Sequence, residues 1–270
     1  MTLPRTKPIC ERAMARRKGS VTLDIPRSER GSQAHYGYQA VTGGRFLRRG
    51  RPRIGKVEGH GALSTDAPAA EFRPLVAFDF DGTLTSRDSF LAFLAWRYGQ
   101  RRYALGMARL GPPAVAYVRH RDRGRLKAAL VAEFLTGESR EALAAAADAF
   151  AAARARRLLR PDAVRCWRLW QKQNARLIVV TASPEILVTP FGRGLGAETV
   201  IGTRLEFSAA GIATGVLDGP NCRSAEKVAR LKAAFGDDVR LEAAYGDSDG
   251  DVAMLAIADE KGMKVFGEKP

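Results

Sequence analysis

Cysteine and histidine are scarce in this chain, and long apolar runs are absent. Three cysteines occur among 270 residues, at Cys10, Cys166 and Cys222, and the three histidines form no metal-binding pattern. The cysteines are odd in number and far apart, which excludes a disulfide framework and a zinc-binding pattern. No stretch reaches about 18 uninterrupted apolar residues, so we expect no transmembrane helix. The N-terminal segment lacks the apolar core of a secretory signal, and a cytoplasmic protein is therefore the simplest expectation.

Acidic residues are few in the first quarter of the chain, which carries most of the net charge of +15. Residues 1–70 hold 14 Lys or Arg against 5 acids, whereas residues 71–270 hold 30 against 24. The first segment is rich in Arg, Gly and Ser and shows no helical or strand period, so we predict a disordered, basic N-terminal extension. Three interpretations of this segment stay open. The first is an arm that binds nucleic acid or an anionic membrane. The second is a dispensable tail, and the third is that translation starts at Val57, so that the preceding residues are not made.

Apolar runs that are typical of buried strands begin near residue 72 and alternate with helical patterns. A helix is predicted over 224–236, and the alternation favours a parallel α/β sheet. The predicted strands cover 74–80, 176–183, 198–207, 240–246 and 263–267. Residues 89–171 are almost wholly helical in pattern, which is too long for one crossover between strands. We therefore predict a core made of 71–88 and 172–270, with 89–171 as an inserted helical cap.

Two local signals define helices inside the predicted cap. Ser139 precedes the Ala-rich run "REALAAAADAFAAARARRLL". It is the predicted N-cap, because its hydroxyl can accept a hydrogen bond from a free backbone N–H of the first turn. After Pro161, the residues Val164, Trp167 and Trp170 recur at helical spacing and are predicted to share one face.

Acidic and hydroxyl side chains follow three of the predicted strands at the point where each strand ends. Ligands of parallel α/β sheets bind beyond the carboxyl ends of strands, so neighbouring strands would bring these residues to one edge. Carboxylates gathered there would repel one another unless a divalent cation lay between them. Oxygen ligands favour Mg²⁺. The residues are Asp79 and Asp81, Thr181 and Ser183, and Asp247, Asp249 and Asp251.

A calcium-binding EF-hand loop is the alternative for closely spaced aspartates. Such a loop needs a glycine at its sixth position and a glutamate at its twelfth. Counted from Asp247, the twelfth residue is Ala258, and counted from Asp79 it is Phe90. Neither segment fits, so the magnesium interpretation is preferred.

Four short motifs, in this order, resemble those of the haloacid dehalogenase (HAD) superfamily. "DFDGTLT" at 79–85 resembles its first motif, and "VVTAS" at 179–183 its second. Lys227 in "CRSAEKVARL" is similar to the third, and "YGDSDGD" at 245–251 to the fourth. The helical insert resembles the cap of subfamily IB, which includes phosphoserine phosphatases. The resemblance covers about 75–270. It implies an α/β fold with a HAD-like, Rossmannoid, doubly wound parallel sheet and an inserted all-helical cap.

The resemblance implies phosphoryl transfer and gives the motif residues their roles. Asp79 would attack phosphorus and form an aspartyl-phosphate. Asp81 would protonate the leaving alkoxide and then take a proton from the attacking water. Thr181 would donate a hydrogen bond to a phosphoryl oxygen, and Lys227 would stabilise charge in the transition state. Because side chains alternate along an extended segment, the spacing of two puts Asp79 and Asp81 on the same side.

The same resemblance implies a Mg²⁺ ion and a set of substrate contacts. The metal would be held by the Asp79 carboxylate, the Asp81 backbone carbonyl and Asp247, with Asp251 binding it directly or through water. Gly82 would also let the backbone turn sharply. The predicted substrate contacts are Gly82, Thr83, Asp88 and Ser183, and for Ser183 a phosphate contact and a role in loop structure both stay open.

Two positions that bear on the substrate differ from the phosphoserine phosphatases. Asp88 stands where they carry a glutamate that helps to hold the substrate amine, and 126–137 contains no arginine for a substrate carboxylate. The prediction is a Mg²⁺-dependent phosphatase for a small, phosphoserine-like phosphate monoester. One alternative is a phosphatidylglycerophosphate-type lipid-head phosphatase at an anionic membrane surface. The other is a nucleic-acid-binding protein that uses the basic extension. We favour the enzyme and expect a small phosphorylated substrate rather than nucleic acid.

Overall fold

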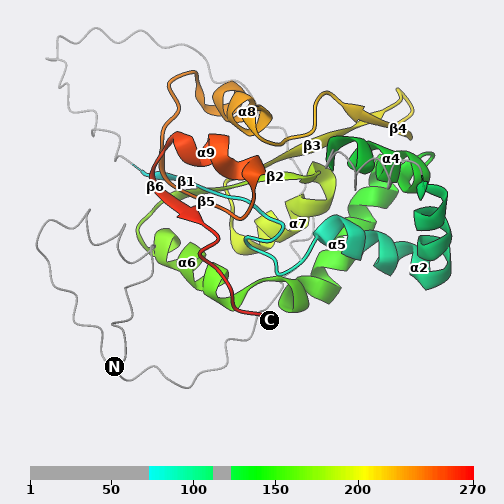
Figure 1. The fold of residues 1–270 in the computed structure, drawn as a ribbon, viewed down its shortest axis with the longest axis horizontal. Coiled ribbons are helices and arrows are strands. Elements are labelled where there is room, and N and C mark those ends of the chain that lie inside the picture. The colour runs from blue at the N-terminus through cyan, green and yellow to red at the C-terminus, as the bar shows by residue number, and fades with distance from the viewer. Residues whose placement is uncertain (1–72, 112–122) are drawn as a thin grey trace, which may run out of the picture. The chain divides into compact units, whose positions relative to one another are not determined.

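The computed structural model describes residues 73–111 and 123–270. They form a six-stranded sheet with helices around it (Figure 1). The strand order is β4-β3-β2-β1-β5-β6, and every neighbouring pair is parallel except β3 with β4. The strands are β1 (Leu75–Phe78), β2 (Arg176–Pro184), β3 (Thr199–Phe207), β4 (Ala213–Asp218), β5 (Leu241–Gly246) and β6 (Ala258–Met263). The predicted α/β fold with a doubly wound sheet is confirmed. The prediction for residues 1–70 lies outside the described residues.

Helices cover both faces of this sheet and one end of it. No helix within the described part of the chain is long and apolar enough to span a membrane. The described helices are α2 (Ser89–Arg109), α4 (Arg123–Leu135), α5 (Arg140–Leu158), α6 (Pro161–Lys172), α7 (Glu185–Leu195), α8 (Ala225–Phe235) and α9 (Val252–Ala256), with a short 3-10 turn, η1 (Asp249–Asp251), before the last.

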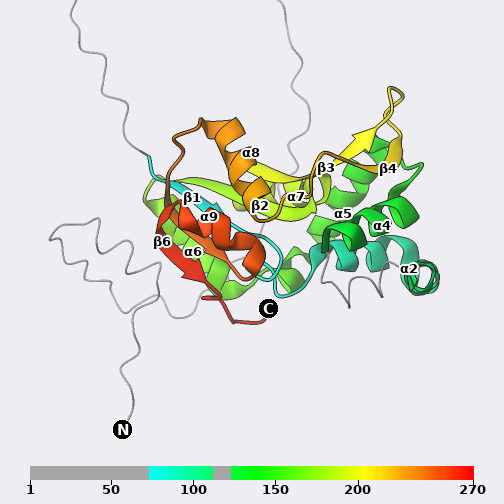
Figure 2. The same ribbon diagram turned by 45° about the horizontal axis from the view of Figure 1, so that its top comes forward.

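Strand β1 lies in the middle of the sheet because its side chains are apolar on both faces. Val76 and Phe78 belong to the core beneath α6 and α7, whereas Leu75 and Ala77 belong to the core beneath α8 and α9. Figure 1 shows α8 and α9 on one side of the sheet and α6 and α7 on the other, and Figure 2 shows α8 and α6 on opposite sides of β1. A strand that is buried on both faces consists of consecutive apolar residues, and this run is what predicts β1 from the sequence.

Helix α6 packs on the sheet through its tryptophans. The rings of Trp167 and Phe78 lie 5.0 Å apart, and Trp167 and Trp170 are fully buried. The shared face predicted for Val164 and these tryptophans is confirmed. Burial of a large apolar side chain contributes about 1.5–3 kcal/mol. Helix α6 lies within the range 89–171, and the boundaries given for core and cap stay a prediction.

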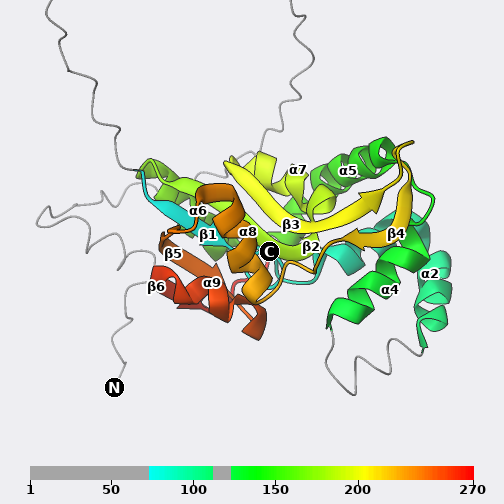
Figure 3. The same ribbon diagram turned by 90° about the horizontal axis from the view of Figure 1, so that it is seen from above.

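Helices α2, α4 and α5 lie together on the side of the molecule toward which β3 runs (Figure 3). Helix α5 packs on α7, and α4 packs beside β4. The predicted N-cap of α5 is confirmed, because the Ser139 hydroxyl accepts a hydrogen bond from Ala142 N at 3.1 Å. Helix α2 is interrupted at Gly99, whose φ of 73° is outside the helical region. These helices therefore stand over the edge of the sheet where the polar strand ends lie.

The last strand was predicted in the wrong place. The sequence favoured 263–267, but β6 spans Ala258–Met263. Within residues 73–111 and 123–270 it is an edge strand, paired with β5 alone, and it carries Asp259, Glu260 and Lys261. Edge strands tolerate charged side chains because backbone hydrogen bonds hold them in place, so the apolar pattern does not reveal them. Strand β4 and helix α7 were not predicted, and α7 contains an internal proline, Pro190, which is atypical of helices.

Candidate active site

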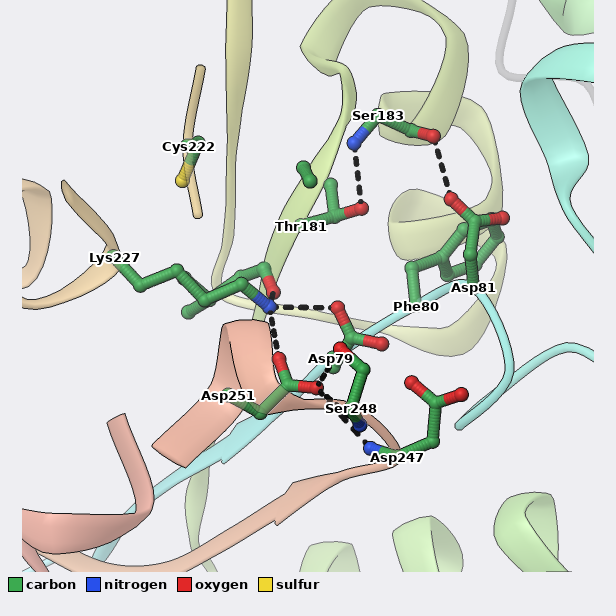
Figure 4. Close-up of polar contacts among 12 residues, drawn as sticks. Asp79, Phe80, Asp81, Thr181, Ser183, Cys222, Lys227, Asp247, Ser248 and Asp251 are labelled. Atoms are coloured by element: carbon green, nitrogen blue, oxygen red, sulfur yellow. Dashed lines mark hydrogen bonds and ion pairs between the residues drawn. The ribbon is translucent and has the colours of Figure 1, made fainter. Parts of the chain in front are cut away.

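The polar strand ends meet at one edge of the sheet. Strand β1 pairs with β2 on one side and β5 on the other, so the predicted convergence of three neighbouring strands is confirmed. Figure 4 shows the side chains at this edge. A cavity of about 400 Å³ lies here, which is within the usual size of small-molecule sites. Its lining includes residues of all four motifs, among them Asp79, Asp81, Thr181, Lys227, Asp247 and Asp251.

The ammonium group of Lys227 lies between two carboxylates at this site. Helix α8 carries Lys227, whose side chain is 1% exposed. Its Nζ donates hydrogen bonds to Asp79 Oδ1 at 2.6 Å, to Asp251 Oδ1 at 2.6 Å and to the Val180 carbonyl at 2.7 Å. All three donors of the ammonium group are therefore used. Buried charges are tolerated when they are paired, and this arrangement fixes the Asp79 carboxylate in one orientation.

The pKa values in this cluster follow from burial and from Lys227. Burial raises the pKa of Asp79 to about 7, although the Lys227 ammonium opposes the rise. Burial would also raise the pKa of Asp251, but Lys227 and the donors of Ser248 outweigh it and hold that pKa below its usual value. Burial disfavours the charged form of Lys227, yet both aspartates outweigh it and raise the Lys227 pKa above its usual value. Lys227 is therefore a permanent positive charge beside Asp79.

Asp81 has different surroundings from Asp79. Its Oδ1 accepts a hydrogen bond from the backbone N–H of Ser89 at 2.7 Å, and its Oδ2 accepts one from the Ser183 hydroxyl at 2.5 Å. Ser89 is the first residue of α2, so a helix inserted after the motif holds this carboxylate in place. One aspartate thus faces an ammonium group and the other faces neutral donors. Two carboxylates in unlike surroundings are suited to separate roles.

Three carboxylates form a possible metal site. Asp79, Asp247 and Asp251 each offer one oxygen, and these oxygens lie within 4.8 Å of one another. Gly82 makes room for this set, since a Cβ at that position would lie 2.2 Å from Asp247 Oδ2 and the backbone φ there is +85°. Hard oxygen donors in this number fit Mg²⁺. The Asp81 carboxylate is not part of the set, and metal binding by its backbone carbonyl stays a prediction.

Asp251 also shapes the loop that presents Asp247. Its Oδ2 accepts hydrogen bonds from Asp247 N at 3.2 Å, from Ser248 N at 3.0 Å and from the Ser248 hydroxyl at 3.0 Å. The side chain is almost completely buried. Because Asp251 is tied to this loop on one side and to Lys227 on the other, it fixes the distance between the fourth motif and Asp79.

The predicted substrate contacts fall into two groups. Gly82 and Asp88 line the cavity, and Asp88 also caps α2 by accepting a hydrogen bond from Leu91 N at 2.8 Å. Ser183 and Thr83 are buried and outside the described lining. Ser183 supports Asp81, and the Thr83 hydroxyl has no hydrogen-bond partner among the described residues. Their contacts with substrate stay predictions.

Thr181 lies where the second motif passes the cavity. It is fully buried, and its hydroxyl oxygen accepts a hydrogen bond from Ser183 N at 3.0 Å. The hydroxyl proton remains for another acceptor, which is compatible with the predicted bond to a phosphoryl oxygen.

Sequence reasoning missed several residues that line the cavity. Helix α4 contributes Lys127, whose Nζ donates to the Ala182 carbonyl, and the loop before α8 contributes Asn221 and Arg223. Lys127 could have been found in the segment 126–137, where the resemblance to phosphoserine phosphatases leads to a search for an arginine. The segment contains a lysine instead, Lys127, and this lysine lines the cavity.

Comparison with known proteins places the chain in a family. The family model for haloacid dehalogenase-like hydrolases matches residues 76–256. The chain belongs to this family. It is also 58% identical over 196 residues to protein CicA from Caulobacter vibrioides, covering 73% of this chain and 88% of the relative. Residues 76–256, which the family model matches, include all four motifs, so the predicted superfamily is confirmed.

Solved structures share the fold of this HAD-family hydrolase. A Bordetella pertussis Tohama I protein of unknown function has a TM-score of 0.56 and 25% identity, covering 68% of this chain and 86% of its own. A probable phosphoserine phosphatase from Vibrio cholerae has a TM-score of 0.50 and 16% identity, covering 70% of this chain and 55% of its own. The second likeness concerns the fold alone.

Proposed function

We propose that the protein is a Mg²⁺-dependent phosphatase that hydrolyses a small phosphate monoester through an aspartyl-phosphate, as a HAD hydrolase of subfamily IB. The observation that carries the proposal is the contrast within the first motif. Asp79 is buried and fixed by Lys227, whereas Asp81 is held by neutral donors beside the same cavity. A fixed nucleophile next to a separate proton carrier is what a two-step phosphoryl transfer needs.

In the first step, a carboxylate oxygen of Asp79 attacks phosphorus, and the bond between phosphorus and the ester oxygen breaks. Asp81 gives its proton to the departing alkoxide, so the alcohol leaves neutral. In the second step, a water molecule attacks phosphorus while Asp81 takes one of its protons. The bond between phosphorus and the Asp79 oxygen then breaks, which releases inorganic phosphate and restores both carboxyl groups.

The remaining residues bind and orient the phosphoryl group. Lys227 holds the Asp79 carboxylate and places a positive charge where negative charge gathers in the transition state. The Thr181 hydroxyl can donate to a phosphoryl oxygen. Asp79, Asp247 and Asp251 would hold Mg²⁺, which when bound offsets the repulsion between an anionic nucleophile and an anionic substrate.

Assays of inorganic phosphate release from small phosphate monoesters test the proposed function. The purified protein is expected to release phosphate in MgCl₂ and to lose this activity in EDTA, because the carboxylate cluster and the substrate are all anionic. Recovery on adding MgCl₂ again is the control for irreversible damage. No release from any ester in MgCl₂, or release that EDTA leaves unchanged, would contradict the proposal.

The proposed metal site predicts that substitutions of two aspartates in one loop change the Mg²⁺ requirement of the enzyme to different extents. Asp247→Asn is expected to raise the Mg²⁺ concentration for half-maximal activity by about 10-fold or more, because one anionic ligand is lost. The matched control is Asp249→Asn, since the Asp249 side chain is 78% exposed and pairs with Arg223. Titration of activity with MgCl₂ measures both. An equal Mg²⁺ requirement in the two variants would remove Asp247 from the metal site.

A further inference from the structure

An arginine stands at a position where helices seldom carry one. Arg160 is the N-cap residue of α6, and its side chain makes no capping hydrogen bond among the described residues. Ser, Thr, Asp and Asn are preferred at N-caps because they accept hydrogen bonds from free backbone N–H groups. A cation at this end of a helix is also unfavourable, since the N-terminus carries a partial positive charge. Residues that break such local preferences are often those that have another role.

The Arg160 guanidinium lies among backbone carbonyls. Its Nε donates to the carbonyls of Gly82 at 3.3 Å and Thr85 at 3.2 Å, so one N–H is shared between two acceptors. Its Nη1 donates to the Glu268 carbonyl at 3.1 Å. The backbone N–H of Arg160 donates to the Leu84 carbonyl at 2.8 Å. A planar guanidinium, with donors in fixed directions, can hold carbonyls of separate segments at the same time.

Two of these carbonyls belong to the loop that follows the aspartates of the first motif. Thr85 N donates to the Phe80 carbonyl at 2.9 Å, and Asp81 and Thr85 form an isolated β-bridge. The loop is therefore a closed turn that carries Asp81 at its start. Gly82, which follows Asp81 directly, lines the cavity. Because Arg160 holds the loop at Gly82 and at Thr85, a loss of these bonds would let Asp81 move.

Proton transfer by Asp81 depends on where its carboxylate lies. The Ser89 N–H and the Ser183 hydroxyl orient this carboxylate, whereas Arg160 holds the backbone that follows it. A proton carrier must lie within about 2.6–3.2 Å of the leaving oxygen. A misplacement of about 1 Å can lower a rate by about 100-fold. A small shift of the loop is therefore enough to impair this step.

The segment after β6 holds Arg160 in turn. Asp162 Oδ2 accepts hydrogen bonds from the backbone N–H groups of Gly267 at 2.7 Å and Glu268 at 3.0 Å. Arg165 Nη1 donates to the Glu268 carboxylate at 3.0 Å. The start of α6 thus fixes the carbonyl that Arg160 binds, although that carbonyl lies 108 residues further along the chain. Little side-chain freedom remains to Arg160, so the loop is bound to a preorganised group.

Arg160 is outside the cavity lining that the structure describes, so its effect on the reaction would pass through the loop. We propose that Arg160 is a positioning residue for proton transfer. It holds the loop of residues 82–85 so that Asp81 reaches the leaving oxygen, and the segment 267–268 holds Arg160. This rests on the proposed phosphatase function and adds to it a residue from outside the four motifs.

Esters with unlike leaving groups separate positioning from a general loss of structure. Nitrophenolate leaves with little protonation, whereas the alkoxide of ethyl phosphate needs the proton of Asp81. The kcat/KM value covers the steps up to formation of the aspartyl-phosphate. The ratio of kcat/KM for nitrophenyl phosphate to that for ethyl phosphate therefore measures proton transfer. A smaller amount of folded enzyme lowers both values equally and leaves this ratio unchanged.

Arg160→Met is expected to raise the ratio about 10-fold or more, because ethyl phosphate loses more than nitrophenyl phosphate. Arg160→Lys is expected to lie between Arg160→Met and the wild type, since an ammonium group can donate to a carbonyl but lacks the planar fork. Asp162→Ala, which releases the segment 267–268, is expected to raise the ratio by less than Arg160→Met. Arg157→Met is the matched control, because Arg157 is an exposed cation in the last turn of α5. It is expected to leave the ratio unchanged.

A ratio in Arg160→Met equal to that of the wild type would overturn the proposal, and so would an equal rise in Arg157→Met. An unchanged ratio in Asp162→Ala would overturn the part of the proposal that concerns the segment 267–268. Asp81→Asn is the reference for lost proton transfer and is expected to raise the ratio most. Thermal unfolding shows that each variant is folded at the assay temperature. Failure of the phosphatase function gives a different result, namely that neither ester is hydrolysed faster by wild type than by Asp79→Asn.

Discussion

Asp79→Asn is expected to lower kcat by roughly 10⁴-fold or more for every phosphate monoester that the wild type hydrolyses, since removal of a nucleophile abolishes the covalent route. The substitution keeps the size of the side chain, and Asn can still accept a hydrogen bond from Lys227. A loss of activity with an unchanged unfolding temperature therefore reports chemistry. Steady-state phosphate release and thermal unfolding are the two measurements.

Asp81→Asn is the matched comparison, because it alters the proton carrier and leaves the nucleophile. General acid–base catalysis contributes typically about 10²- to 10⁴-fold. With nitrophenyl phosphate, whose leaving group needs little protonation, this variant is expected to give a burst of nitrophenolate followed by slow turnover. The burst reports formation of the aspartyl-phosphate, and slow turnover reports its hydrolysis. A burst from Asp79→Asn, or equal activity of Asp79→Asn and wild type, would overturn the assigned roles.

Lys227→Met is expected to have the largest effect on stability. Lys227 is buried between Asp79 and Asp251, at 2.6 Å from an oxygen of each. Its removal leaves two buried carboxylates without their shared cation, and loss of one partner from a buried ion pair costs about 3–5 kcal/mol. Urea unfolding in EDTA measures this loss. Activity is expected to fall about 100-fold or more as well, because a fixed positive charge at the phosphoryl group is lost.

The pH dependence of this stability loss has a defined sign. Burial raises the pKa of Asp79 to about 7, and without Lys227 that pKa would be higher still. Folding then favours the protonated carboxyl, so the variant gains stability as the pH falls toward the pKa of the unfolded chain. The free energy of unfolding is therefore expected to differ less between wild type and Lys227→Met at about pH 5 than at about pH 8. Lys232→Met is the control, since Lys232 is exposed on the same helix. A pH-independent difference would contradict the assignment.

The local elements could be predicted because each depends on its own residues. The run "LVAF" is apolar on both sides and predicts a central strand, which β1 is. Ser139 before an Ala-rich run predicts a helix start, because the capping hydrogen bond lies within four residues of sequence. The short spacing of Asp79 and Asp81 after a buried strand predicts a site at the strand end. These inferences need no knowledge of distant parts of the chain.

The sequence predicted less well where position depends on partners that are far away. Strand β6 is held by backbone hydrogen bonds to β5, and its charged residues carry no apolar pattern. Ser183 was open between two roles, and only the folded chain brings its hydroxyl to Asp81, 102 residues earlier. The same is true of Ser89, whose backbone N–H holds the other oxygen of Asp81.

The sequence by itself determined the family, the parallel sheet and the residues that gather at its edge. The spacing of residues within a motif and the pattern of apolar residues in a strand are properties of short segments, so they can be recognised without knowledge of any tertiary contact. Only the tertiary structure decided what each side chain faces: Lys227 pairs with Asp79 across 148 residues, and Lys127 reaches Ala182 across 55. Charge pairing, burial and access to the leaving group depend on those contacts, because the energy of a charge is set by its neighbours in space.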